Sequence, residues 1–373
     1  MKIPQFKMER WQSVYENTVE LNISESGVKP LSSQELIEDP ADLAIILATP
    51  LGYPQSNGSE ELRERVALQF PGARVENVLV TTGCAEANFH VALSLIESGD
   101  EVVFMQPNYM QVGGLARGLG ANVKSWWLRE NLRWAPDLAE LDHLVTSKTR
   151  LIVVCNPNNP TGAVLTEPAM DAICRAAAKV GAWLLADEVY RGAEFDGNLT
   201  PTFWGRYERV LCTGGLSKSY GLPGLRTGWV VAPGDFCASL WSYKDYTTIS
   251  ASLLSDRLAS HALEPARRDR LFERTRCILR ENYPILAEWL AKRGSAFAHV
   301  PPRAGAIAWV RYAGTQKSAA LAEELRARKS VLLVPGEQFE MEHFIRVGFG
   351  YDAGVLRHAL ERMEDILART TAA

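Results

Sequence analysis

The sequence predicts an α/β fold, in which a large doubly wound domain with a mostly parallel sheet is joined to a smaller α+β domain. Three observations support this prediction. Helix-like and strand-like stretches alternate from about residue 60 to about residue 260. Most of the strand-like stretches are continuous apolar runs, which is typical of strands that helices cover on both faces. After about residue 260 a long charged helical stretch leads into short strands, so a second, smaller domain is expected.

The elements of the large domain can be placed in order along the chain. An amphipathic helix over 58–70 begins with Ser59, a residue type that caps helix N-termini, and a second helix is predicted over 85–97. Short apolar runs predict strands over 77–83, 100–107, 122–128, 149–157, 182–190, 209–217 and 228–233.

The smaller domain begins with the charged helical stretch 263–294. Apolar strands follow over 306–312, 331–336 and 344–350, and an amphipathic helix ends the chain. The first 40 residues or so are too few to fold alone and are expected to dock across this domain. The expected division is therefore 1–40 for the N-terminal segment, 41–260 for the large cofactor-binding domain and 261–373 for the small C-terminal domain.

Composition argues against several classes of function. The formal net charge is −4, from 40 Lys and Arg against 44 Asp and Glu. The chain therefore lacks the excess of positive charge that is typical of proteins that bind nucleic acid or an anionic membrane. The six cysteines and six histidines are dispersed, without the paired spacing of a disulfide frame or a metal site. No apolar run reaches membrane length, and the first residues lack the apolar core of a leader. A cytoplasmic protein with no metal, nucleic acid or membrane partner is expected.

Three polar segments each follow a predicted strand. NPNNPTG occupies 156–162, DEVY occupies 187–190 and LSKSYGLPGLRTG occupies 216–228. Each stands where a strand meets its loop at the carboxyl edge of the sheet, the place where open α/β sheets bind ligands. Taken singly, each has an ordinary explanation as a turn, a helix cap or a surface loop. Their order and their common position at strand ends favour one shared site.

These segments contain the groups that an aldehyde cofactor such as pyridoxal phosphate (PLP) requires. Lys218, in a partly desolvated cleft, can form a Schiff base with the aldehyde. Asp187 can keep a pyridine nitrogen protonated, so that the ring acts as an electron sink. Asn159 and Tyr190 can donate to the ring's phenolate oxygen.

A cofactor phosphate requires backbone N–H groups at a helix start and a fixed cation. Gly83, Cys84 and Ala85 open a helix directly after a strand. Arg226 lies eight residues beyond Lys218 and can supply the cation. The sequence therefore predicts a phosphate site where this helix and the lysine loop meet.

The three segments resemble those of the class I/II aminotransferase family, the fold-type I PLP enzymes, in order and approximate spacing. The resemblance covers essentially the whole chain and implies the aspartate-aminotransferase type of fold with PLP as cofactor. It implies Lys218 as the lysine that carries the cofactor, Asp187 as the partner of the pyridine nitrogen and Arg226 as a phosphate ligand. Asn159 and Tyr190 are implied as contacts to the ring hydroxyl, Asn159 also facing the substrate.

The same resemblance extends to residues outside the three segments. Tyr109 would stack on the cofactor ring, and Tyr53 would reach the phosphate of the neighbouring subunit, which implies a homodimer with shared active sites. Arg346 would hold the substrate α-carboxylate as a bidentate pair, and the backbone of Gly27 would touch the same carboxylate. The partner implied is a small-molecule substrate, an amino acid.

One position departs from the family pattern. The family often has Ser or Thr three residues before the lysine, where it binds phosphate, and this chain has Gly215. Phosphate binding is then expected to depend on Ser217, Arg226 and the turn from Gly83 to Ala85. The departure affects the detail of the phosphate pocket and leaves the choice of cofactor unchanged.

The shared motifs do not separate transamination from side-chain elimination, because both begin with loss of the α-proton. The family as a whole favours an L-amino acid:2-oxo acid aminotransferase. SGV near the N-terminus, LRENLRWAPDL, LSKSYGLPGLRTGW and KDYTTIS are similar to segments of capreomycidine-synthase-like enzymes, which eliminate a side-chain group from a hydroxylated arginine. That similarity implies a β- or γ-lyase or a cyclase.

An arginine-like substrate, such as canavanine or hydroxyarginine, requires an acidic group at the far end of the pocket. Glu25 is the first candidate and Asp245 the second; each is equally compatible with a structural role. A catalytically inactive regulator on the same fold is a third class of function. The complete set of Lys218, Asp187 and Arg226 argues against it.

Overall fold

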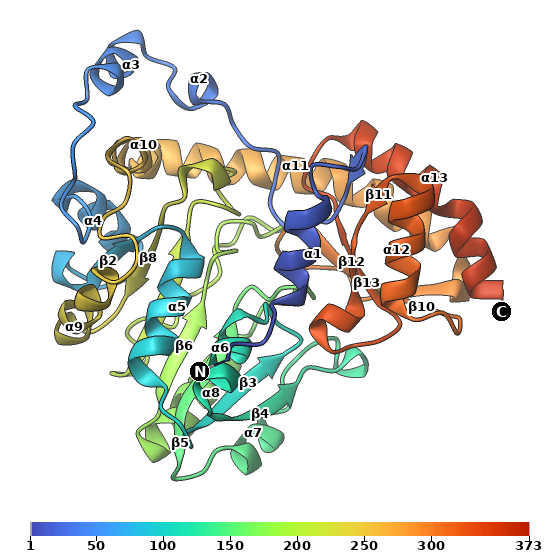
Figure 1. Ribbon diagram of the computed structural model, residues 1–373, viewed down its shortest axis with the longest axis horizontal. Helices are drawn as coiled ribbons and strands as arrows, with labels where there is room; N and C mark the ends of the chain where they lie inside the picture. The colour runs from blue at the N-terminus through green and yellow to red at the C-terminus, as the bar shows by residue number, and fades with distance from the viewer. Residues whose placement is uncertain (1, 373) are drawn as a thin grey trace.

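A seven-stranded sheet forms the centre of the larger part of the computed structural model, which describes residues 2–372 (Figure 1). The strand order is β2-β8-β7-β6-β5-β3-β4, and β8 alone among the described strands of this sheet runs antiparallel to its neighbours. The strands are β2 (Val78–Thr81), β3 (Glu101–Gln106), β4 (Asn122–Trp127), β5 (Thr149–Cys155), β6 (Trp183–Asp187), β7 (Val210–Gly215) and β8 (Gly228–Val231). The predicted doubly wound, mostly parallel sheet is confirmed.

Helices cover both faces of this sheet, and their caps show how the sequence starts and stops them. They are α4 (Glu60–Ala67), α5 (Cys84–Leu95), α6 (Gln111–Leu119), α7 (Leu138–Leu144), α8 (Glu167–Val180), α9 (Gly234–Lys244) and α10 (Leu253–Leu263). The Ser59 hydroxyl accepts the Leu62 amide at 3.3 Å, as the predicted cap requires. Helix α8 ends at Gly181, whose φ of 70° is the left-handed conformation that glycine adopts without strain.

The apolar strands are buried on both faces, because alternate side chains enter two different hydrophobic clusters. In β5, Ile152 and Val154 belong to one cluster, and Leu151 and Val153 belong to the other. Side chains along a strand point alternately to opposite faces. Continuous apolar runs, rather than an alternating pattern, are therefore what such strands need.

The smaller part of the molecule has its own hydrophobic cluster around a four-stranded antiparallel sheet of order β12-β13-β10-β9. Its strands are β9 (Phe297–His299), β10 (Ile307–Tyr312), β12 (Val334–Pro335) and β13 (Phe344–Gly348), with β11 (Val331–Leu332) beside them. Its helices are α11 (Pro265–Ala291), α12 (Ser318–Lys329) and α13 (Ala353–Ala372). Strand β9 and helix α12 were not among the expected elements.

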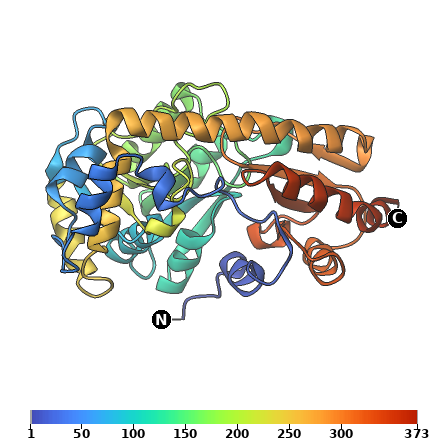
Figure 2. The ribbon, with the colours of Figure 1, turned by 90° about the horizontal axis from the view of Figure 1, so that it is seen from above.

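Helix α11 extends along the length of the molecule and packs against both parts, as the view from above shows (Figure 2). Its first half contributes Leu271 and Phe272 to a cluster of the large sheet, and its second half contributes Leu286 and Trp289 to the cluster of the smaller part. Single turns of 3-10 helix lie at Val75–Asn77, Glu130–Leu132, Pro223–Leu225, Gly294–Ala296 and Gly336–Phe339.

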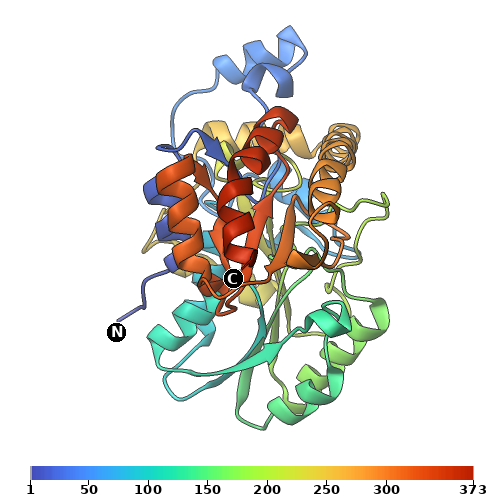
Figure 3. The same ribbon diagram turned by 90° about the vertical axis from the view of Figure 1, so that its right-hand side faces the viewer.

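The N-terminal segment crosses the molecule before the large sheet begins. It forms α1 (Lys7–Tyr15), β1 (Leu21–Asn22), α2 (Ser33–Leu36) and α3 (Pro40–Leu47). Strand β1 pairs in parallel with β11 of the smaller part. Helices α2 and α3 lie at the periphery of the molecule (Figures 1 and 3), where Leu36 of α2 is buried in the core and Asp42 of α3 pairs with Arg267 of α11. Helix α3 has no buried residue, although it is rich in Leu and Ile.

Within residues 2–372, none of the helices combines the length and the apolar character needed to cross a bilayer.

Candidate active site

A cavity of about 280 Å³ lies at the carboxyl ends of β5, β6 and β7, between the large sheet, α1 and β13. Its position is the one that open α/β sheets offer to ligands. It brings together residues that are far apart in the sequence. Those predicted from the sequence that line it are Glu25, Cys84, Ala85, Tyr109, Asn159, Asp187, Tyr190, Ser217, Lys218, Arg226 and Arg346.

Lys218 lies in the loop after β7, and its side chain is 26% exposed in the cavity. Its Nζ is 3.8 Å from a carboxylate oxygen of Glu25, which stands on the opposite wall. Gly27 does not itself line the cavity but packs against the lysine. A Cβ at Gly27 would come within 3.2 Å of the Ser217 carbonyl oxygen and 3.6 Å of Lys218 Cδ. The missing side chain therefore leaves room for the lysine stem.

Asp187 ends β6 and is buried at the floor of the cavity. Its Oδ1 accepts the Val189 amide at 3.1 Å, and its Oδ2 accepts the Asn88 side-chain amide at 3.2 Å. Burial raises the pKa of Asp187, while these hydrogen bonds and the charge of Lys218 oppose that shift. A buried carboxylate held this way is stabilised by a cationic N–H partner, such as a protonated pyridine nitrogen.

The phosphate end of the cavity is built on the first turn of α5. Helix starts leave backbone N–H groups without helical acceptors, here those of Cys84 and Ala85. Gly83 precedes them with a φ of 80°, and a Cβ there would lie 2.5 Å from Arg226 Nη2. Only glycine therefore allows the Arg226 guanidinium to approach this turn. Arg226 Nη1 also donates to the Ser217 hydroxyl at 3.4 Å.

Gly215 lies in β7 close to the same turn. A Cβ at Gly215 would be 3.0 Å from the Thr227 carbonyl oxygen and 3.5 Å from the Cys84 amide nitrogen. A serine or threonine would need neighbouring backbone to shift. The phosphate donors that this chain offers instead are Ser217, Arg226 and the α5 turn.

The walls of the cavity hold their polar groups in defined orientations. The Tyr190 hydroxyl donates to the Ser26 hydroxyl at 2.9 Å, and both side chains are buried. Burial raises the pKa of Tyr190, so this phenol remains protonated at neutral pH. The Tyr109 hydroxyl donates to a Glu9 carboxylate oxygen at 2.9 Å.

Arg346, in β13, is 1% exposed. Its Nη1 donates to Asn159 Oδ1 at 3.0 Å and its Nη2 donates to the Ser24 carbonyl oxygen at 2.7 Å. Its Nε has no hydrogen-bond acceptor among the described residues. Burial lowers the pKa of Arg346, and the nearby Tyr190, Glu25 and Glu9 act in the opposite direction. A buried guanidinium with an unsatisfied donor is suited to a carboxylate ligand.

Two carboxylates that sequence reasoning missed, Glu9 and Glu16, join Glu25 in lining the cavity. Burial, together with the charges of Glu25 and Glu9, raises the pKa of Glu16, while Lys218 lowers it. The sequence carried a signal for this cluster. Glu9, Gln12 and Glu16 stand three and four residues apart, the spacing that places side chains on one helix face.

Asn88 was also missed, although it lies four residues after Cys84 and therefore on the same face of α5. It connects Asp187 to the next strand, because its side-chain oxygen accepts the Thr213 hydroxyl at 2.9 Å.

Two of the residues predicted from the sequence lie outside the cavity lining. Tyr53 is 86% exposed, and Asp245 is the exposed residue that ends α9.

The residues present fit PLP. The α5 turn with Arg226 and Ser217 can hold a phosphate, Asp187 can pair with a pyridine nitrogen, and Lys218 reaches into the cavity between them. The fold and this site define a PLP-dependent enzyme of the aspartate-aminotransferase type. The chain belongs to the aminotransferase class I and II family, whose sequence model matches residues 33–363. Its cofactor is pyridoxal 5'-phosphate.

Known proteins similar to this chain include capreomycidine synthase of Streptomyces vinaceus, 34% identical over 98% of the chain and 94% of the relative. Arginine–pyruvate transaminase of Pseudomonas aeruginosa is 29% identical over 85% of the chain and 83% of that protein. Among solved structures, a PLP-dependent aminotransferase from Streptococcus suis is 34% identical, covers 99% of both chains and has a TM-score of 0.93. The fold is therefore shared over its whole length.

Proposed function

We propose that this enzyme acts on an L-amino acid with a guanidine-like cation at its far end and catalyses β- or γ-elimination from the side chain. Canavanine and hydroxyarginine are the candidate substrates. The observation that carries the proposal is the cluster of Glu9, Glu16 and Glu25 on the wall of the cavity that also contains Lys218 and Arg346.

This cluster is electrostatically unfavourable without a cation. The raised pKa of Glu16 records mutual repulsion among the carboxylates in addition to burial. Two cations line the same cavity: Lys218, whose Nζ is 3.8 Å from Glu25, and Arg346, whose pKa is lowered by burial and raised by the charges of Glu25 and Glu9. A lysine that carries the cofactor is unavailable for this pairing, and Arg346 is assigned to the substrate α-carboxylate. A guanidinium, with five N–H donors in a fixed fork, can bridge two carboxylates at once.

In this proposal different residues bind the two ends of the substrate. Arg346 holds the α-carboxylate through charged hydrogen bonds, with Asn159 and the backbone of Gly27 beside it. Lys218 accepts the proton that leaves the α-carbon, Asp187 holds the proton on the pyridine nitrogen, and Tyr190 with Asn159 donates to the ring oxygen. The bound cofactor supplies an electron sink for the charge that develops at the α-carbon.

The phosphate is assigned to Gly83, Cys84, Ala85, Ser217 and Arg226, and the ring face to Tyr109. The similarity to capreomycidine synthase supports elimination, because it extends over 98% of this chain. The runner-up is an L-amino acid:2-oxo acid aminotransferase. The similarity to arginine–pyruvate transaminase favours this alternative. It is compatible with the same cluster of Glu9, Glu16 and Glu25, called the acidic wall below.

We further propose that the enzyme works as a homodimer. The apolar face around α3 supports this: Leu47, Leu51 and Tyr53 are 77%, 84% and 86% exposed, and Tyr246 is 90% exposed. Large apolar side chains that are this exposed are common at protein interfaces. A second copy would bring Tyr53 toward its partner's cofactor. An active monomer in sedimentation at assay concentration would contradict this.

The deciding experiment separates the two reactions. The purified holoenzyme is offered canavanine, hydroxyarginine and norleucine, each with and without pyruvate, and ammonia, released guanidino compounds and new keto acids are measured. Elimination predicts turnover of the guanidino substrates without pyruvate. Turnover that strictly requires pyruvate would identify an aminotransferase. Norleucine has no side-chain leaving group, so it is used as a competitive inhibitor beside arginine, and inhibition by norleucine as tight as that by arginine would remove the cluster of Glu9, Glu16 and Glu25 from substrate selection.

A further inference from the structure

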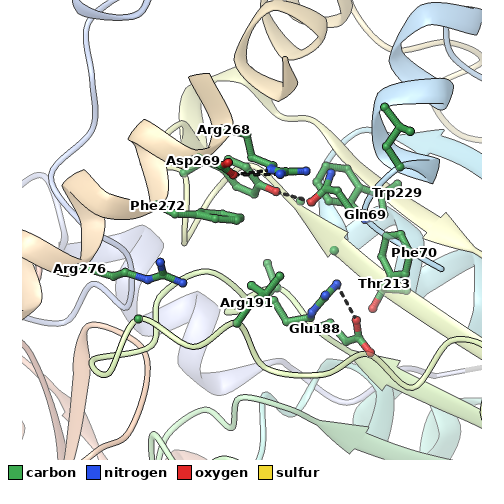
Figure 4. Close-up of a pocket in the computed structure, with 17 residues that line it drawn as sticks. Gln69, Phe70, Glu188, Arg191, Thr213, Trp229, Arg268, Asp269, Phe272 and Arg276 are labelled. Carbon is green, nitrogen blue, oxygen red and sulfur yellow. Dashed lines mark hydrogen bonds and ion pairs between the residues drawn. The ribbon is translucent and has the colours of Figure 1, made fainter. Parts of the chain in front are cut away.

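Three ion pairs of lysine or arginine in the described part of the chain have both side chains no more than 12% exposed: Arg191–Glu188, Arg276–Glu194 and Lys244–Glu86. Taking two charges out of water is costly, so each pair requires a compensating role. Residues of the first two pairs line a cavity of about 290 Å³ beside β7 and the first half of α11 (Figure 4). Their carboxylates accept backbone amides of the segment 192–203 and hold that loop. The third pair lies elsewhere, at the start of α5.

Glu86 holds the turn that leads from β2 into α5. It is the third residue of this helix, and its Oε2 accepts the Thr82 amide at 2.5 Å. Its own amide donates to the Gly83 carbonyl oxygen at 3.2 Å. The backbone N–H groups of Cys84 and Ala85, which are assigned to the cofactor phosphate, belong to the same turn. The Glu86 carboxylate therefore fixes the backbone on which the phosphate site is built.

The negative charge of Glu86 conflicts with phosphate binding at this turn. Burial raises the pKa of Glu86, but hydrogen bonds from Thr248 and Thr82 and the charge of Lys244 lower it to about 2. Glu86 is therefore an anion at neutral pH. A phosphate dianion bound at the same turn would be repelled by it, because two like charges at short range in a partly buried site are poorly screened. A cation dedicated to Glu86 would remove this repulsion.

Lys244, in the last turn of α9, meets this requirement. Its side chain is 0% exposed, and lysine is rarely buried without a partner. Its Nζ donates to Glu86 Oε2 at 3.1 Å and to the Thr248 hydroxyl at 2.8 Å. The Thr247 and Thr248 hydroxyls donate to Glu86 Oε1 at 2.8 and 2.7 Å. A ring nitrogen of His90 is 3.8 Å from the same carboxylate, but burial lowers the pKa of His90, so this ring is neutral at neutral pH.

We propose that Lys244 is a positioning residue of the phosphate site. By neutralising Glu86, it allows this carboxylate to fix the turn before α5 without repelling a phosphate dianion bound there. The inference rests on the proposed assignment of the cofactor phosphate to that turn. It also gives the segment KDYTTIS a role, because Lys244, Thr247 and Thr248 of this segment all bind the same carboxylate.

The test compares how tightly the full-length apoenzyme binds PLP and pyridoxal, which lacks the phosphate. Both compounds offer the same aldehyde and ring to Lys218 and Asp187, so a substitution that disturbs those contacts changes both dissociation constants together. Absorbance titration at about pH 8, where Glu86 is ionised, measures the two constants. Lys244→Met should reduce the preference for PLP about tenfold or more, because the unpaired Glu86 carboxylate then repels the phosphate.

Two further variants separate the effect of charge from mechanical support. Glu86→Gln keeps an oxygen for the Thr82 amide and gains an amide group that can donate to the threonine hydroxyls, so it should retain the preference for PLP. The double variant Lys244→Met/Glu86→Gln should recover most of the preference that Lys244→Met loses. A pair that only braces α5 against α9 predicts the reverse, with a loss in each single variant and the largest loss in the double variant.

A preference for PLP that is unchanged in Lys244→Met, lost in Glu86→Gln or not recovered in the double variant would overturn the proposal. The Glu86→Gln result decides it even if Lys244→Met does not fold. The matched control is Lys124→Met, which breaks the 2.6 Å pair with Glu101 at the start of β3. It should leave the preference unchanged, and a loss as large as that in Lys244→Met would also overturn the proposal.

Arg226→Met tests the phosphate assignment on which the proposal rests, and it should lower the preference for PLP. If it does not, or if the unsubstituted enzyme binds pyridoxal as tightly as PLP, the phosphate is not held at this turn and the assignment itself fails. A clear preference that depends on Arg226 but not on Lys244 would overturn the role of Lys244 alone.

Discussion

The two ends of the active cavity are built differently. The cofactor end consists of residues at the ends of strands, such as Asp187, the last residue of β6, and Lys218, in the loop after β7. Hydrogen bonds hold Asp187 to Asn88 of α5 and to the Val189 amide. The end proposed for the substrate side chain consists of the half-buried Glu9, Glu16 and Glu25 from the N-terminal segment. The proposed roles therefore assign the reaction's common chemistry and the choice of substrate to separate parts of the chain. Substitutions at the two ends should therefore have different consequences.

The largest effect is expected at the cofactor end, for Lys218→Ala. This substitution should abolish turnover with every amino acid, because among the residues lining the cavity no other amine can hold the cofactor covalently. Absorbance spectroscopy before and after borohydride reduction checks the covalent link. A cofactor that remains reducible onto the protein in this variant would contradict the assignment.

Asp187→Ala should reduce kcat by a factor of about 100 or more and leave cofactor loading largely intact. Without the carboxylate the pyridine nitrogen is less readily protonated, and a loss of about 3 kcal/mol of transition-state stabilisation corresponds to that factor. Asp187→Glu serves as the control that keeps the charge. Near-normal rates in a fully loaded Asp187→Ala enzyme would remove this role.

Arg346→Met should raise KM for guanidino substrates and the inhibition constant of aliphatic amino acids alike, by a factor of about 10 to 100. The loss of a charged, bidentate hydrogen bond is worth about 1.5–3 kcal/mol. Steady-state kinetics on canavanine, and competitive inhibition of that reaction by norleucine, which has no side-chain leaving group, measure the two effects. A loss confined to one substrate would show that Arg346 does not hold the group that all amino acids share.

Glu25→Gln should weaken guanidino substrates by about 1–3 kcal/mol, and aliphatic ones much less. Glu16→Gln is the matched variant for the same cluster of carboxylates. It leaves the 3.8 Å Lys218–Glu25 pair in place and removes only the longer-range interaction of Glu16 with the lysine, so its effect on Lys218 should be smaller. Equal losses on both substrate classes in both variants would remove the acidic wall from substrate recognition.

The smallest effect expected is a pH dependence of substrate preference. The pKa of Glu16 is raised, so this carboxyl loses its negative charge at a higher pH than an ordinary glutamate as the solution is acidified. The preference for guanidino over aliphatic substrates should therefore be complete at alkaline pH and decline as the pH falls through the raised pKa. Glu16→Gln should flatten that profile, and an unchanged profile would contradict the assignment.

The sequence predicted the cofactor end far better than the substrate end. The strands of the large sheet are uninterrupted apolar runs, and NPNNPTG, DEVY and LSKSYGLPGLRTG directly follow three of them, so local patterns were enough. Strand β9 was missed because it has only 3 residues, and helix α12 because its sequence is rich in Ala and charged residues and carries no strong apolar pattern.

Glu9 and Glu16 were missed for another physical reason. Their spacing on α1 showed that they share a face, but only the tertiary fold shows what that face meets. Strand β1 pairs with β11, more than 300 residues later in the chain, and this pairing anchors the segment that follows α1. No local pattern encodes such a contact. The sequence also did not show why position 83 is a glycine. Its φ of 80° favours glycine, and a Cβ there would lie 2.5 Å from Arg226 Nη2, a contact that only the tertiary fold creates.

Helix α11 also has a mechanical consequence. With 27 residues it is a beam about 40 Å long, fixed in the large sheet's core by Phe272 and in the smaller core by Leu286 and Trp289. A tilt of about 5° at one end moves the other end by about 3–4 Å. A small rotation of α11 at one core therefore displaces the other core by several ångströms, so the relative position of the two cores depends on the angle of this one helix.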